Sequence, residues 1–200
     1  MIHSLVHRPP PLVLGPLLGL VVVAAFALLN ERVGVVGGFS DVVERLIEVL
    51  EPGPRERLLE VGPGTGYYSL AIAELLERGR LEVYDLQEEM IDHVLSRAKE
   101  RGLKNVTGWT GDAREMLFEK DRFDGAYLTL VLGEIPDQDA ALRELRRVLK
   151  PTGRLVVGEL AVDPHVVFPG ALERRAQAAG LRVEHRDGSA LGYFARLRRA

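Results

Sequence analysis

Short apolar runs alternate with amphipathic segments along most of the chain. The apolar runs cover residues 57–61, 81–84, 106–109, 123–128 and 154–160, and the amphipathic segments cover 68–78, 88–101, 138–149 and 168–179. Strands that alternate with helices of this length form a parallel sheet with helices on both faces. The pattern therefore predicts an α/β fold, preceded by one more amphipathic helix at residues 39–50.

The C-terminal region has a different pattern. Two apolar runs, 181–186 and 193–197, are separated by the turn residues Asp187-Gly188-Ser189, which is typical of an antiparallel hairpin. Together with the five earlier runs they predict a Rossmann-like, doubly wound, seven-stranded sheet that is mostly parallel. Lys150-Pro151-Thr152-Gly153 is predicted to be a turn between the preceding helix and its strand.

The N-terminal region contains an uncharged apolar stretch from Leu12 to Leu29. Its length is close to the roughly 20 residues that span a bilayer. Three interpretations stay open: a membrane anchor, which we favour, a signal peptide cleaved near Ala25-Phe26-Ala27, or a buried packing helix. We expect residues 1–33 to form this apolar helix and residues 34–200 to form the folded domain, with the GVVGG sequence at 34–38 as the junction.

Composition and charge exclude several functions. The net charge of -3 argues against a dedicated nucleic-acid binder, because phosphate contacts need a basic balance. The chain has no cysteine, which excludes disulfides, thiolate metal sites and a thiol nucleophile, and we expect no metal. The length of 200 residues is sufficient for one domain with a buried core.

The sequence LLEVGPGTGYYSL, from Leu58 to Leu70, contains three glycines directly after a predicted strand. A glycine-rich turn between a strand and a helix lets a ligand approach the backbone and the helix N-terminus. Dinucleotide sites use the spacing G-x-G-x-x-G, but here Tyr67 stands where the third glycine belongs. Glu60 would also repel a pyrophosphate. A cationic ligand is better tolerated beside it.

The motif E-x-G-x-G-x-G, from Glu60 to Gly66, resembles the first motif of the class I S-adenosylmethionine-dependent methyltransferases. The resemblance continues in the order of that family through the later predicted strands. It includes Asp85 at the end of the second strand, Gly111-Asp112-Ala113 after the third, FDGAY at 123–127 and LRRVLKPTG at 145–153. The match covers about residues 39–197.

The resemblance implies S-adenosylmethionine as cofactor, S-adenosylhomocysteine as product, and methyl transfer as the reaction. It implies that Asp85 accepts hydrogen bonds from the ribose hydroxyls and that Asp112 contacts the adenine amino group. The full set of implied cofactor-binding residues is Glu60, Gly62, Gly64, Gly66, Tyr67, Asp85, Leu86, Asp112, Ala113 and Tyr127. Carboxylates and aromatic faces suit a sulfonium cation better than arginines do.

The methyl-accepting side is less defined by the sequence. Many members of the family that act on small molecules have a histidine or a polar pair where Gly133 and Glu134 stand. Glu134 and His165 are therefore the candidate catalytic residues, as a base that deprotonates the acceptor. The alternatives are that Glu134 is a solvated loop acid or helix cap and that His165 is incidental.

An apolar N-terminal segment beside such a domain favours an acceptor that partitions into the bilayer, such as a phospholipid amine, a quinone or another lipophilic small molecule. Because the cofactor is made in the cytosol, we expect the chain at the cytoplasmic side of the membrane, anchored or peripheral, with a soluble cytoplasmic protein as the alternative. Arg143, Arg146, Arg147 and Lys150 form a basic helix face that either contacts anionic headgroups or is simply solvated.

Two alternative functions remain at this point. One is an NAD(P)-dependent oxidoreductase, which Tyr67 and the second acid at Asp112 disfavour. The other is a non-catalytic interaction module that keeps the cofactor pocket. The sequence leaves open the acceptor atom and the oligomeric state.

Overall fold

The computed structural model describes residues 38–189 and 191–200, with side chains from Val42 onward. Val42–Ala200 forms one compact unit. The apolar stretch 12–29 and most of the predicted glycine junction lie outside the described residues. Within the described part of the chain, no helix is both long enough and apolar enough to cross a membrane.

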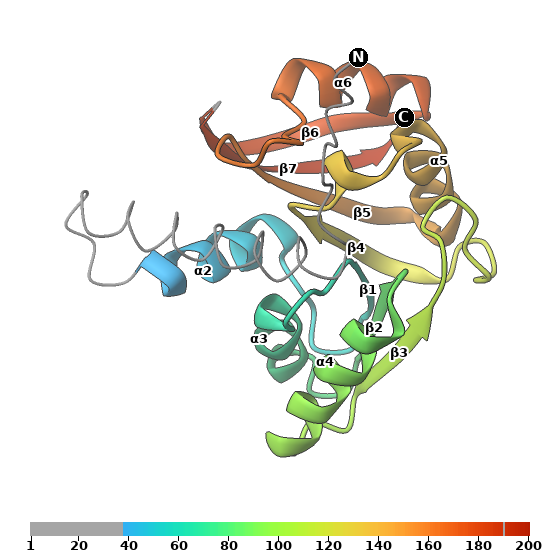
Figure 1. The fold of residues 1–200 in the computed structure, drawn as a ribbon. Helices are drawn as coiled ribbons and strands as arrows, with labels where there is room; N and C mark the ends of the chain where they lie inside the picture. The colour runs from blue at the N-terminus through green and yellow to red at the C-terminus, as the bar shows by residue number, and fades with distance from the viewer. Residues whose placement is uncertain (1–37, 190) are drawn as a thin grey trace, which may run out of the picture. The chain divides into compact units, whose positions relative to one another are not determined.

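Seven strands form a single sheet (Figure 1). They are β1 (Arg57–Val61), β2 (Arg80–Asp85), β3 (Val106–Thr110), β4 (Phe123–Thr129), β5 (Leu149–Leu160), β6 (Leu181–Ser189) and β7 (Gly192–Arg199). Their order is β3-β2-β1-β4-β5-β7-β6. The first five strands pair in parallel, and β7 is antiparallel to both of its neighbours. The predicted doubly wound sheet with a C-terminal hairpin is confirmed.

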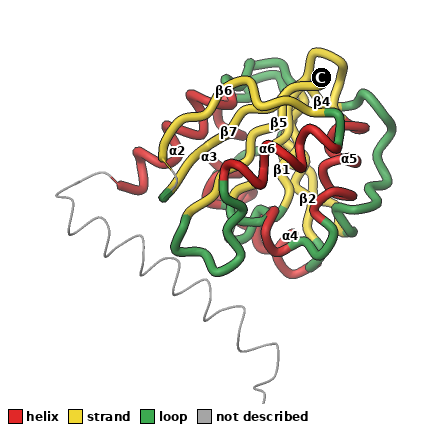
Figure 2. Tube along the Cα trace, turned by 90° about the horizontal axis from the view of Figure 1, so that it is seen from above, coloured by secondary structure: helices red, strands yellow, loops and turns green. Residues whose placement is uncertain are grey.

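Helices cover both faces of the sheet (Figure 2). They are α2 (Gly38–Leu50), α3 (Tyr67–Leu75), α4 (Glu88–Glu100), α5 (Gln138–Val148) and α6 (Pro169–Ala178), with the short 3-10 helix η1 (Leu132–Glu134). Apolar residues of α2, α3 and α4 form one core layer against the sheet. Residues of α5 and α6 form the second layer against the other face. Because helices cover both faces of the sheet, side chains on both sides of each strand are buried, and the strands appear in the sequence as continuous apolar runs.

Two predicted turns belong to strands in the structure. Residues 150–153 lie within β5, where Leu149 pairs with Phe123 and Arg154 pairs with Gly125. The ladder therefore skips four residues of β5, and the turn expected from the Pro-Thr-Gly sequence is a bulge in the strand. Asp187-Gly188-Ser189 likewise extends β6, so the connection to β7 begins after Ser189.

The basic face expected on the helix at 138–149 is largely tied into the protein. Arg147 pairs with Glu144 at 2.7 Å and donates to main-chain carbonyls. Lys150 pairs with Asp124 at 2.5 Å, and Arg146 donates to the carbonyl of Gly180. These contacts account for three of the four basic side chains without an anionic surface.

Trp109 lies on β3, the edge strand of the sheet, and is 41% exposed. Its ring packs edge-on against Phe118 at 5.4 Å between ring centres, and the Arg122 guanidinium lies 5.9 Å above it. The ring therefore closes the end of an aromatic cluster that continues through Phe118 to Tyr84 and Phe123.

Candidate active site

The three glycines after β1 all adopt positive φ angles, at 68° for Gly62, 52° for Gly64 and 76° for Gly66. Side-chain-bearing residues rarely adopt this conformation. A Cβ at Gly62 would lie 2.4 Å from Cγ2 of Val131, whereas a Cβ at Gly64 would meet nothing within 4 Å. The turn is therefore closely packed at Gly62 and open at Gly64, where a ligand can approach the backbone.

Backbone hydrogen bonds hold this turn in place. The N–H of Gly62 donates to the carbonyl of Tyr84 at 2.9 Å, which joins the turn to β2. Arg97 on α4 donates to the carbonyl of Thr65. Helix α3 begins directly after Gly66 and has no side-chain cap. Its first N–H groups, with their partial positive charge, therefore lie beside the glycine turn.

Glu60 lies in β1 and is only 2% exposed. Ser69 of α3 donates a hydrogen bond from Oγ to Glu60 Oε2 at 2.5 Å. Burial raises the pKa of Glu60 to about 7, against the opposing effect of the Ser69 hydrogen bond, and the nearby charge of Asp85 raises it further. A cation beside Glu60 would favour its charged form. Nothing in the sequence marks Ser69 as a partner of Glu60, since serine on a helix is common.

Tyr127 lies deeper than expected for a residue that contacts a ligand. It is fully buried in the core layer under α3. Its hydroxyl makes no regular hydrogen bond with a described residue, but it interacts with the Glu60 carboxylate, and burial raises its pKa well above the usual value. Tyr127 therefore lies beside Glu60 on the neighbouring strand, with its hydroxyl near the Glu60 carboxylate in the core.

Asp85 ends β2 at the same edge of the sheet. Its Oδ1 accepts a hydrogen bond from the N–H of Gln87 at 2.9 Å, and burial raises its pKa. A carboxylate has about four acceptor positions, so Asp85 retains capacity for a diol. The neighbouring Leu86 is 71% exposed and offers an apolar surface beside this carboxylate.

Asp112 follows β3, as expected, but it is paired with Arg114. The guanidinium and the N–H of Arg114 bind both carboxylate oxygens, with Nη2 2.6 Å from Oδ2. These hydrogen bonds lower the pKa of Asp112 to about 2. Ala113 packs beside the core. An adenine amino group would have to share the Asp112 carboxylate with Arg114, and sequence spacing alone did not indicate this partner.

Tyr67 is the first residue of α3 and is 36% exposed. Its ring lies edge-on to Tyr68, with 5.2 Å between ring centres. The exposed aromatic ring is therefore placed beside the glycine turn, at the position where a dinucleotide site would need a third glycine.

The two candidate catalytic residues lie together at the ends of β4 and β5. Gly133 of η1 packs against the loop after β5 so closely that a Cβ would lie 1.8 Å from the carbonyl oxygen of His165. Partial burial and the negative charge of Asp163 raise the pKa of Glu134, His165 opposes this, and the charge of Asp85 adds to it. The charge of Asp85 and the charges of the loop that carries Asp163 and His165 therefore all act on the Glu134 carboxyl group.

Asp163 organises this loop. It is 6% exposed, and its Oδ1 accepts the N–H of His165 at 2.8 Å and lies 3.7 Å from His165 Nδ1. The Asp163 carboxylate therefore holds the backbone of His165 in place and lies beside its imidazole. The Asp-Pro-His sequence contained this pair, but only the structure shows that the aspartate is buried and turned toward the histidine.

Glu159 is an acid that the sequence analysis did not single out. It is 4% exposed, it accepts the N–H of Val167 through Oε2 at 3.2 Å, and its Oε1 has no partner among the described residues. Burial raises its pKa to about 7, and the charges of Asp163 and Glu134 contribute. The one indication in the sequence was that this glutamate stands inside an apolar run predicted to be a buried strand.

The arrangement fits a positively charged sulfur nucleoside. The turn at Gly64 is open, an acid with spare acceptor positions ends the next strand, and Glu60 and Glu134 add negative potential around it. Ligands of open α/β sheets bind outside the carboxyl ends of the strands, where these residues lie. No group of three potential metal-ligating side chains occurs in the part of the chain that the structure describes.

Comparison with known proteins agrees with this geometry. Residues 58–153 match a family model described as "Methyltransferase domain". A ubiquinone/menaquinone biosynthesis C-methyltransferase, UbiE, from Ruegeria sp. (strain TM1040) is 32% identical over 123 residues, which cover 61% of this chain and 49% of that protein. The chain thus spans about half the length of the curated relatives it matches.

Solved structures share the fold. A SAM-dependent methyltransferase from Aquifex aeolicus superposes with a TM-score of 0.66 at 21% identity, over 78% of this chain and 96% of that one. The cyclase SpnF superposes with a TM-score of 0.67 at 25% identity, over 74% of this chain and 58% of that one. The motifs, the match to the methyltransferase-domain model over residues 58–153 and the similarity to the C-methyltransferases support a class I S-adenosylmethionine-dependent methyltransferase, and the solved structures share its fold.

Proposed function

We propose that this protein transfers a methyl group from S-adenosylmethionine to a lipophilic small molecule of the quinone type. The observation that carries the proposal is the glycine turn, open at Gly64, with Glu60 and Asp85 beside it. The family match favours methyl transfer over the dinucleotide-dependent oxidoreductase. Carbon methylation of a quinone precursor is supported by relatives of about 30% identity that carry that activity in their names.

The cofactor-binding residues have distinct tasks in this proposal. Asp85 accepts hydrogen bonds from two ribose hydroxyls, while Leu86 covers the adjoining ring. Glu60 provides negative charge near the amino and sulfonium end, held in position by Ser69 and Tyr127. When bound, S-adenosylmethionine supplies an activated methyl group. The protein aligns the acceptor with it and excludes water.

The acceptor must lose a proton during or after methylation. Glu134 is the proposed base, since its raised pKa brings it closer to neutral pH, where a general base is most effective. His165, oriented by Asp163, is the second candidate at the same location. Glu159 is a buried acid that interacts with the charges of Asp163 and Glu134, and one of its oxygens has no partner among the described residues.

A lipophilic acceptor implies contact with a membrane surface, and we propose that the chain acts at the cytoplasmic side. The apolar sequence at 12–29 supports this as an anchor or peripheral contact. We also propose that residues 34–200 constitute the catalytic domain. Expression followed by separation of membrane and soluble fractions tests the localisation, with a chain beginning at Gly34 as the comparison.

The activity is tested by incubating the protein with methyl-labelled S-adenosylmethionine and a total lipid extract, then identifying the labelled product. We expect a labelled quinone precursor and at least tenfold slower labelling by Glu134→Gln. The substitution Glu89→Gln, on the exposed first turn of α4, removes one charge elsewhere and serves as a control. Cofactor binding without any labelled product would favour the non-catalytic module instead.

A further inference from the structure

The amino ends of β1 and β2 carry two Arg-X-Arg segments, Arg55-Glu56-Arg57 and Arg78-Gly79-Arg80. The strand register places Arg57 directly beside Arg80. The ladder continues outward, because the N–H of Arg80 donates to the carbonyl of Glu56 at 2.9 Å and the N–H of Arg78 to that of Pro54 at 2.8 Å. The two segments therefore run side by side and set arginines next to arginines.

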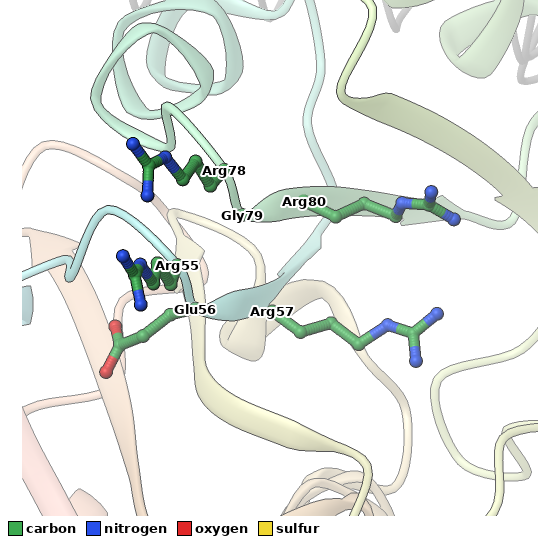
Figure 3. A pocket seen from close by; sticks show the side chains of 6 residues that line it. All are labelled: Arg55, Glu56, Arg57, Arg78, Gly79 and Arg80. Carbon is green, nitrogen blue, oxygen red and sulfur yellow. The ribbon is translucent and has the colours of Figure 1, made fainter.

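Figure 3 shows how these side chains are directed. Arg55 and Arg78 extend together to one side of the paired backbones, and Arg57 and Arg80 extend together to the other. The six residues of the two segments line an open hollow of about 380 Å³. Like charges at directly opposed strand positions are unfavourable. Such an arrangement needs a compensating negative charge.

Of the four arginines, only Arg57 has an acidic partner among the described residues. The carboxylate of Glu56 already binds Arg154 at 2.5 Å and the N–H of Gly53 at 2.9 Å. Glu82 is 1% exposed and is shared between Arg57 and Arg122, at 2.6 and 3.0 Å.

The remaining three arginines of the hollow, Arg55, Arg78 and Arg80, are exposed. Their side chains form no hydrogen bond or ion pair with any residue for which the structure gives a position. Their positive charge is therefore not neutralised by the described protein.

The backbone of the hollow is fixed in advance. A Cβ at Gly79 would lie 2.3 Å from the carbonyl oxygen of Glu56, so only glycine allows the two segments to approach this closely. Interstrand hydrogen bonds on both sides of Gly79 hold the arginine backbones in place. A ligand would then order only the side chains on binding, which lowers the entropic cost.

We propose that this hollow is a binding site for a small, soluble, phosphoryl-bearing anion. Arginine guanidinium groups bind phosphate oxygens in a bidentate manner, and two adjacent arginines complement a doubly charged group. The lining contains no aromatic or aliphatic side chain, so a nucleoside base would find no stacking surface. The ligand class is a compact polyanion such as a diphosphate.

The site is separate from the methyl-transfer site, because it lies at the amino ends of strands whose carboxyl ends carry the glycine turn. This location also argues against an anionic lipid surface as the ligand. A bilayer bound at the amino ends would leave the carboxyl ends, where the lipophilic acceptor is proposed to bind, facing away from it. The soluble anion is therefore the better match.

Isothermal titration of the full chain with inorganic pyrophosphate at low ionic strength tests the proposal. We expect saturable binding, and at least tenfold weaker binding by the double variant Arg55→Gln/Arg78→Gln. The control variant Arg174→Gln/Arg182→Gln also removes two positive charges, but from exposed positions outside the hollow. We expect its affinity for pyrophosphate to stay within twofold of that of the parent protein. Urea unfolding should be unchanged in both variants, which verifies folding independently of the methyltransferase proposal, and affinity for S-adenosylhomocysteine should also be unchanged.

Three results would overturn the inference. The first is absence of pyrophosphate binding by the parent protein. The second is equal weakening in both double variants, which would mean that only net charge matters. The third is binding to phosphatidic acid vesicles that depends on Arg55 and Arg78 and is not displaced by pyrophosphate, which would identify a lipid headgroup surface.

Discussion

Asp85 is the residue from which the cofactor site can be tested most directly. Its carboxylate ends β2 and keeps acceptor positions beyond its bond to Gln87. Loss of a hydrogen bond to a charged group costs about 1.5–3 kcal/mol, so Asp85→Asn should weaken S-adenosylhomocysteine about tenfold to a hundredfold by titration calorimetry. Asp92→Asn, an exposed position on α4, removes the same charge and should have no effect. Equal affinities for all three proteins would exclude Asp85 from the site.

The glycines of the turn should separate stability from binding. At Gly62, a Cβ would meet Val131 at 2.4 Å in a positive-φ conformation, so Gly62→Ala should lower the free energy of unfolding by about 2–4 kcal/mol. At Gly64 the added methyl group has space but keeps the backbone strain, so Gly64→Ala should cost only about 1 kcal/mol. The larger effect of Gly64→Ala should be a loss of cofactor affinity. Urea unfolding and titration of S-adenosylhomocysteine measure the two quantities, and a reversed order would contradict the packing.

Individual residues differ in how far the sequence predicts them. The glycines and Asp85 were predictable because they are fixed by local chemistry, namely a turn with positive φ and an acid at a strand end. The pairing of Asp112 with Arg114 and of Glu60 with Ser69 was not. These contacts depend on side-chain directions, which neither spacing nor residue type specifies.

At the scale of elements, η1 and the loop after β5, which form the proposed acceptor side, pack closely together at Gly133. Gly133→Ala would place a Cβ 1.8 Å from the main-chain oxygen of His165. Because this oxygen belongs to the backbone, the clash cannot be relieved by a change of side-chain rotamer. We expect displacement of the loop, a loss of stability of about 2 kcal/mol or more, and a lower turnover rate with little change in cofactor affinity.

Gly170→Ala near the start of α6 is the matched control. A Cβ at Gly170 would meet only Arg174, at an ordinary 3.7 Å, and alanine is the better helix former by up to about 1 kcal/mol. This variant should keep its activity and unfold at the same or a higher denaturant concentration. If Gly133→Ala behaved in the same way, the two elements would not form a single unit.

The elements themselves followed closely from the periodicity of the sequence, and the misplaced features were turns. Residues 150–153 carry strong turn chemistry, yet Leu149 is already paired with Phe123 in the sheet. Hydrogen bonding of these residues into the sheet, with a bulge, competes with their local preference for a turn. That hydrogen bonding depends on β4, whose residue Phe123 lies 26 positions before Leu149 in the chain. Local sequence therefore predicts which segments pair but not where the pairing begins.

At the scale of the whole molecule, the buried acid Glu60 makes stability depend on pH. Its pKa rises from 4.5 to about 7 on folding, so the folded state binds more protons than the unfolded state between those values. The contribution of Glu60 to stability therefore falls as the pH rises from about 4.5 to 7, and its cost is complete above 7. Glu60→Gln should be more stable than the parent at pH 8, by up to about 3 kcal/mol, with the difference nearly absent at pH 4.5.

Thermal or urea unfolding of both proteins at the two pH values measures this difference without a ligand. Glu159 has a similar pKa of about 7, but it is present in both proteins and cancels from the comparison. A difference that grows toward acid pH would mean that Glu60 is stabilised as a carboxylate by its neighbours, contrary to the effect of burial.

Trp109 is the single tryptophan of the chain, and it lies partly exposed on the edge strand, three positions before the acid that follows β3. Its fluorescence therefore reports on one defined place in the molecule. Adenine approaching Asp112 should change the emission intensity, whereas loosening of the aromatic cluster around Phe118 should shift the emission to longer wavelength. The protein thus contains its own optical reporter, which needs no attached dye.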